Sequence, residues 1–136
     1  MRKLLCQVAL ILLLPILPAV AAALWHPLKQ SWKSDEITLA QAEKTAAKIL
    51  WIDARSEADF SAAHIPGAML LNEDAWDTLL PEVLSAWEEG KLVVVYCSSL
   101  SCHTSREVAR RLREEAGLPS VYVLTGGWET WKKAHP

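Results

Sequence analysis

The 136-residue chain has few cysteines, no run of five or more basic residues and no internal repeat. Its cations are not interleaved with aromatic side chains, so nucleic-acid binding is not expected. Its three cysteines are too few for a disulfide scaffold, and one of them, Cys6, lies in an apolar N-terminal stretch. The rest of the chain therefore holds two thiols, Cys97 and Cys102.

The N-terminal stretch has the layout of an export segment. MRKLLCQVALILLLPILPAVAAALW places two cations before an apolar block and then small residues, as secretory signals do. The block is also long enough to cross about 30 Å of hydrocarbon. Residues 1–23 are thus predicted to be a signal peptide or an N-terminal membrane anchor. Pro15 and Pro18 weaken a continuous membrane helix, and we favour cleavage.

In either case Arg2 and Lys3 should stay inside, which places the rest of the chain outside the cytoplasm. We expect it in the periplasm or secreted, or anchored to the inner membrane, with membrane contact only through residues 1–23. Without Arg2 and Lys3, the rest of the chain has 12 of the 14 lysines and arginines and all 16 aspartates and glutamates. Its formal charge is therefore −4. An extracytoplasmic location also permits a disulfide.

The remaining chain divides into a tether, residues 24–36, and a domain, residues 37–136. Short apolar runs predict strands at 49–53 (ILWID), 91–96 (KLVVVY) and 121–125 (VYVLT). Helical patterns separate these runs, which predicts an α/β fold with a mainly parallel sheet. Ligands of such sheets bind at the carboxyl ends of strands, where Cys97 lies.

Five segments are predicted to be helical. Thr38 and Gln41 match a capping box at the start of the first, and Gly117 should end the fourth. Pro81 should break the third helix near Leu80. The segments are LAQAEKTAAK, EADFSAAH, WDTLLPEVLSAW, SREVARRLREEAG and GGWETWKKA.

The loop CSSLSCH, residues 97–103, joins a predicted strand to a predicted helix. Such a loop directs backbone N–H groups inward, and the helix dipole adds partial positive charge, so a thiolate there is stabilised. We predict that Cys97 is a nucleophile, although cysteine at a strand end is also a common packing residue. Cys102 could resolve an intermediate, form a disulfide with Cys97 or fill the loop. The backbone expected to hold the substrate is that of Ser98, Ser99, Leu100, Ser101, Cys102 and His103.

Polar residues elsewhere have more modest predicted roles. Asp53 and Arg55 follow the first long strand and are interpreted as an ion pair that supports the edge of the site. His64 is interpreted as a hydrogen-bonding turn residue, whereas His103 is the titratable residue of the loop. The two thiols and His103 are too few and too crowded for a structural zinc site, and we expect neither metal nor cofactor.

Three motifs resemble those of rhodanese-like domains, in the right order across about residues 37–134. They are DARSEADFSAAHIPGAMLL, then VVVYC, which matches the segment that carries the family's catalytic cysteine, here Cys97, and the closing VYVLTGGWETW. The resemblance implies a three-layer α/β/α fold with a mainly parallel central sheet of about five strands. It also implies that Cys97 takes sulfur from a donor such as thiosulfate, becomes a persulfide and passes the sulfur to a thiophilic acceptor.

The loop departs from this family pattern. Sulfurtransferase members commonly carry Arg or Lys soon after the cysteine and Arg near the loop's end, where this chain has Ser98, Ser99 and Cys102-His103-Thr104. Each charge-assisted hydrogen bond lost costs about 1.5–3 kcal/mol, which favours a persulfide or polysulfide donor over thiosulfate. We predict a sulfurtransferase whose partners are a small sulfur-donor anion or persulfide and a protein thiol acceptor. Two alternatives stay open: a thiol–disulfide oxidoreductase using Cys97–Cys102, and a non-catalytic rhodanese-like binding module.

Overall fold

The computed structural model describes residues 35–45, 48–98 and 103–136. The predicted signal or anchor and nearly all of the tether, residues 1–34, lie outside these described ranges. Five strands form one sheet in the order β1-β5-β4-β2-β3, and all four neighbouring pairs are parallel. The strands are β1 (Glu36–Ile37), β2 (Ile49–Asp53), β3 (Met69–Leu70), β4 (Leu92–Tyr96) and β5 (Val121–Leu124).

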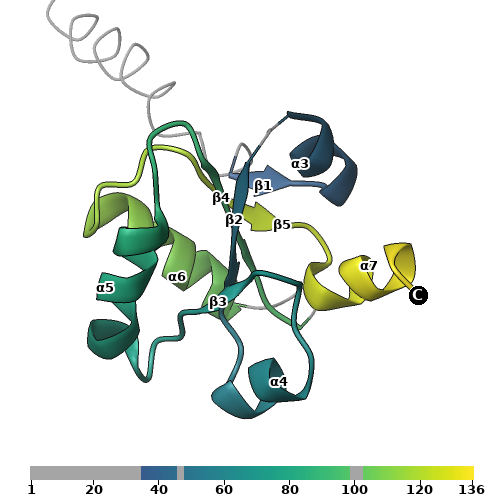
Figure 1. Cartoon of the computed structure of the whole chain (residues 1–136), viewed down its shortest axis with the longest axis horizontal. Coiled ribbons are helices and arrows are strands. Elements are labelled where there is room, and N and C mark those ends of the chain that lie inside the picture. The colour runs from purple at the N-terminus through teal and green to yellow at the C-terminus, as the bar shows by residue number, and fades with distance from the viewer. Residues whose placement is uncertain (1–34, 46–47, 99–102) are drawn as a thin grey trace, which may run out of the picture. The chain divides into compact units, whose positions relative to one another are not determined.

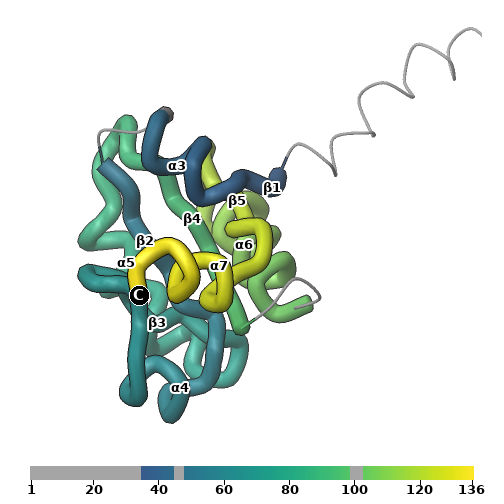
Figure 2. Tube along the Cα trace, turned by 90° about the vertical axis from the view of Figure 1, so that its right-hand side faces the viewer, coloured from purple at the N-terminus to yellow at the C-terminus, as the bar shows by residue number. Residues whose placement is uncertain are grey.

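Helices cover both faces of the sheet, which confirms the three-layer α/β/α architecture. α5 and α6 pack on one face through side chains such as Val83 and Leu112, and α3, α4 and α7 cover the other (Figure 1). Figure 2 looks onto this second layer, with α7 in front of the sheet between α3 and α4. The helices are α3 (Leu39–Thr45), α4 (Glu57–Ala62), α5 (Trp76–Ala86), α6 (His103–Glu114) and α7 (Gly127–Ala134).

β4 is the middle strand, and its alternating side chains reach both layers. Val93 and Val95 belong to the core beneath α5 and α6, whereas Val94 and Tyr96 belong to the core beneath α3, α4 and α7. All five β4 residues are buried, as expected for a parallel strand covered on both faces. Cys97 follows β4 directly, so the fold places it at the carboxyl edge in the middle of the sheet.

The predicted break at Pro81 is wrong, because α5 runs through this residue without interruption. Pro81 is exposed, whereas Trp76 and Val83 on either side of it are buried in the core. Packing of this apolar face offsets the loss of one backbone hydrogen bond. The Ser85 hydroxyl also donates to the Pro81 carbonyl at 2.9 Å.

Helix boundaries otherwise follow the local signals closely. The Thr38–Gln41 capping box is formed, since the Thr38 N–H donates to Gln41 Oε1 at 3.0 Å and the Gln41 N–H donates to Thr38 Oγ1 at 3.3 Å. Gly117, with φ of +71°, comes after α6. Within the described ranges, no helix has both the length and the hydropathy needed to span a membrane.

Candidate active site

The sulfur of Cys97 lies between β4 and the first turn of α6. Cys97 is 2 % exposed, and its Sγ accepts a hydrogen bond from the Ser105 hydroxyl at 3.3 Å. Cys97 is disulfide-bonded in this structure, and the other two cysteines, Cys6 and Cys102, lie outside the described residues. α6 therefore contributes a buried hydroxyl directly to the sulfur of the predicted nucleophile.

The backbone of Cys97 is held by the start of α7. The Trp128 N–H donates to the Cys97 carbonyl at 2.7 Å. Gly127 precedes it with φ of +54°, and a Cβ added there would lie 2.2 Å from the same carbonyl oxygen. The closing Gly-Gly-Trp motif thus has a physical reason: only glycine lets the α7 start approach the Cys97 backbone this closely.

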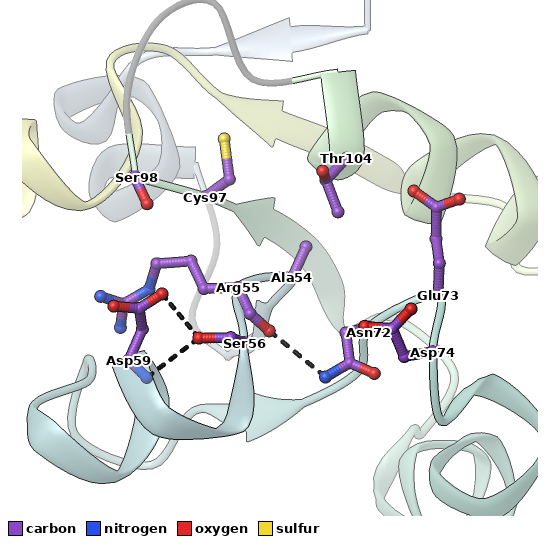
Figure 3. Close-up of a pocket in the computed structure, with 10 residues that line it drawn as sticks. All are labelled: Ala54, Arg55, Ser56, Asp59, Asn72, Glu73, Asp74, Cys97, Ser98 and Thr104. Atoms are coloured by element: carbon purple, nitrogen blue, oxygen red, sulfur yellow. Dashed lines mark hydrogen bonds between the residues drawn. The ribbon is translucent and has the colours of Figure 1, made fainter.

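Cys97 opens into a pocket of about 400 Å³ at the carboxyl ends of the strands (Figure 3). Its wall includes the loop after β2, the loop after β3, the end of β4 and the first turn of α6. The lining residues are Ala54, Arg55, Ser56, Asp59, Asn72, Glu73, Asp74, Cys97, Ser98 and Thr104.

The predicted loop residues are only partly covered by the structure. Ser98 lines the pocket and is exposed, whereas Ser99, Leu100, Ser101 and Cys102 lie outside the described residues. His103 is the first residue of α6, exposed, and does not line this pocket. The predicted role of the loop backbone in substrate binding stays a prediction.

Arg55 and Asp53 form the ion pair expected from the sequence, and it is buried. Arg55 Nη2 lies 2.6 Å and Nε 3.1 Å from Asp53 Oδ2, and Nη2 also donates to the Ala63 carbonyl at 2.7 Å. Its guanidinium carbon lies 4.8 Å from the centroid of the Trp128 ring. Burial lowers the pKa of Arg55, but the hydrogen bond and charge of Asp53 outweigh it and raise that pKa above its usual value. The pair therefore ties the β2 end to α4 and α7.

His64 has a structural role outside the pocket. Its Nδ1 lies 2.8 Å from the Phe60 carbonyl, and its ring stacks on that of Phe60 with centroids 4.0 Å apart. No cluster of three or more metal-ligating side chains occurs among the described residues.

Sequence reasoning missed the half of the pocket that faces Cys97. Ser56, Asp59 and Thr104 were not assigned to the site, nor was the run Asn72-Glu73-Asp74. The run follows β3, an edge strand of two residues within the short apolar run AMLL, residues 68–71, which was not assigned as a strand from the sequence. Had β3 been recognised, its carboxyl end would have placed the run at the site by the same rule that placed Cys97.

Tyr96, beneath the site, is expected to make the stability of the domain fall at alkaline pH. Its buried hydroxyl accepts a hydrogen bond from the Ile65 N–H at 3.2 Å, and burial, then the nearby Asp53, raises the pKa of the phenol above its usual value. The unfolded chain loses this proton from about pH 10, while the folded domain keeps it. Stability is thus fully present below that pH and should fall as pH rises further. Urea denaturation between about pH 9 and 11 should show that the free energy of unfolding falls with pH, and that it falls less in Tyr96→Phe. Equal falls in the two proteins would contradict this prediction.

Comparison with known proteins gives a family match and several similar relatives. The rhodanese-like domain family profile matches residues 36–134. The "Thiosulfate sulfurtransferase GlpE" of Coxiella burnetii is 35% identical over 88 residues, 65% of this chain and 76% of the relative. The protein of that name from Stutzerimonas stutzeri is 29% identical over 97 residues, 71% of this chain and 82% of the relative.

Solved structures share the fold. The BH2092 protein from Bacillus halodurans aligns with a TM-score of 0.60 at 23% identity, covering 84% of this chain and 81% of that one. A rhodanese-related protein from Thermoplasma volcanium aligns with a TM-score of 0.55 at 18% identity, covering 74% of this chain and 92% of that one.

Proposed function

Because the chain belongs to the rhodanese-like domain family, we propose that it is a sulfurtransferase that carries sulfur as a persulfide on Cys97. One observation carries the proposal: Cys97 directly follows the central strand β4, lines the pocket and receives a hydrogen bond from Ser105 of α6. Its relatives named thiosulfate sulfurtransferase support the reaction class.

Each group has a role in the proposed reaction. In the reduced protein the Ser105 hydroxyl would donate to the Cys97 thiolate, and the dipole at the start of α6 would stabilise the same charge. The thiolate attacks the outer sulfur of the donor, whose S–S bond breaks, and a persulfide forms on Cys97. A thiophilic acceptor then removes that sulfur and restores the thiolate.

The disulfide on Cys97 favours a second candidate, a thiol–disulfide oxidoreductase. We propose Cys102 as its second thiol, since it lies five positions along the chain and an extracytoplasmic location permits the bond. Residues 1–23 would deliver the domain to that location. In this second reaction Cys97 would exchange disulfides with a protein thiol and carry no sulfur atom.

Mass spectrometry separates the two functions. Reduced protein incubated with thiosulfate or polysulfide should gain about 32 Da, one sulfur atom, on Cys97. Cys102→Ser should still gain it, and Cys97→Ser should not. If no donor adds sulfur while a Cys97–Cys102 disulfide forms at accessible potentials, the sulfurtransferase proposal is wrong and the oxidoreductase is supported.

A further inference from the structure

The wall of the pocket opposite Cys97 is acidic. Asp59 from α4, and Glu73 and Asp74 from the loop after β3, all line it and are exposed. In Figure 3, Cys97 and Ser98 lie at the upper left, Asp59 lies at the lower left, and Glu73 and Asp74 lie on the right of the view. A molecule that reaches Cys97 through this pocket therefore passes carboxylates from two separate segments.

No cation on the described wall offsets this charge. Arg55 is the one basic residue among the lining side chains, and its guanidinium is already paired with the buried Asp53. Asp59, Glu73 and Asp74 take part in none of the ion pairs among the described residues. Residues 99–102, which lie outside the described ranges, are Ser, Leu, Ser and Cys and carry no charged side chain.

The negative charge of the pocket wall disfavours the binding of an inorganic dianion. Thiosulfate would approach Cys97 past three carboxylates. Because these groups have the same sign of charge as thiosulfate, they lower its local concentration in the cleft. A ligand that carries an amine gains from the same field. The volume of about 400 Å³ suits a small molecule.

We propose that the sulfur donor of this site is the persulfide of a small aminothiol, with Glu73 and Asp74 as specificity-determining residues for its ammonium group. The inference rests on the proposed sulfurtransferase function. Cys97 is first reduced by a thiol. Its thiolate then attacks the outer sulfur of RS–SH, the donor S–S bond breaks, RS⁻ leaves, and Cys97 becomes the persulfide. The donor is reduced to its thiol as Cys97 is oxidised, so no further oxidant is needed.

The test compares donors that differ mainly in charge. Protein reduced with dithiothreitol and then desalted is mixed with the persulfide of cysteamine or of 3-mercaptopropionate, and sulfur gain on Cys97 is followed by mass spectrometry. At low salt the cationic donor should load roughly tenfold faster than the anionic one. Added salt should reduce this ratio, because the carboxylates are exposed.

Matched variants assign the preference to the pocket. Glu73→Gln/Asp74→Asn should bring the ratio of the two rates close to one. Glu82→Gln/Glu89→Gln removes the same charge from exposed residues that do not line the pocket and should keep the ratio. The salt series on the unmodified protein provides a second test that needs no variant.

The outcomes are distinct. Equal loading by both donors, or a ratio that Glu73→Gln/Asp74→Asn leaves unchanged, would overturn the substrate assignment and leave the sulfurtransferase proposal in place. Absence of the sulfur adduct with both persulfides and with thiosulfate would overturn both.

Discussion

Arg55→Leu is expected to destabilise the domain by about 3–5 kcal/mol, because it leaves the Asp53 carboxylate buried without its partner. Asp53 is 0% exposed, and Arg55 holds it through both Nε and Nη2. Small domains have only about 5–15 kcal/mol in total, so much of this variant should be unfolded at moderate temperature. Urea denaturation measures the change in the free energy of unfolding.

Two further variants make the Arg55 test specific. Arg106→Leu removes an arginine whose ion pair with Glu36 is exposed, and it should cost at most about 1 kcal/mol. Asp53→Asn/Arg55→Leu removes both charges and should recover part of the loss, since no buried charge remains. If Arg55→Leu and Arg106→Leu cost the same, the buried pair has no special role.

Gly127→Ala is expected to cost roughly 2–4 kcal/mol and to slow sulfur loading of Cys97. Part of the cost is the positive φ of +54°, which disfavours a side chain, and part is the overlap of the new Cβ with the Cys97 carbonyl. The overlap involves backbone, so relief requires a shift of the strand end that carries the nucleophile. Urea denaturation and the rate of sulfur gain by mass spectrometry report the two effects.

Gly117→Ala is the matched control for this prediction. Gly117 also has a positive φ, +71°, but nothing lies within 4 Å of its added Cβ. Its substitution should cost only about 1–2 kcal/mol of backbone strain and leave the loading rate unchanged. Equal loading rates in Gly127→Ala and the unmodified protein would show that the α7 start does not position Cys97.

Sequence patterns predicted the parts of the fold that have a strong local signal. β2, β4 and β5 are continuous apolar runs, and the Thr38–Gln41 box marks the start of α3. The missed strands β1 and β3 have two residues each, and only pairing with their neighbours defines them. The break expected at Pro81 failed because a local rule ignored the packing of the helix on the sheet.

The same division holds for the site. Cys97 was predicted because it directly follows a recognisable strand and lies in a motif. The acidic wall was not, because Asp59, Glu73 and Asp74 are ordinary exposed residues in the sequence and come together only through the order of the strands. The contact of Gly127 with the Cys97 carbonyl likewise joins residues thirty positions apart.

The hydrogen bond from Trp128 to Cys97 also sets the order in which the site can be assembled. During synthesis Cys97 emerges well before Trp128, so a growing chain carries the cysteine before it has the group that fixes its backbone. A chain truncated before α7 would likewise have the Cys97 thiol but would lack the Trp128 N–H that holds its backbone. The backbone hydrogen bond that holds the reactive centre therefore cannot form before α7 is present, although the cysteine itself directly follows the central strand.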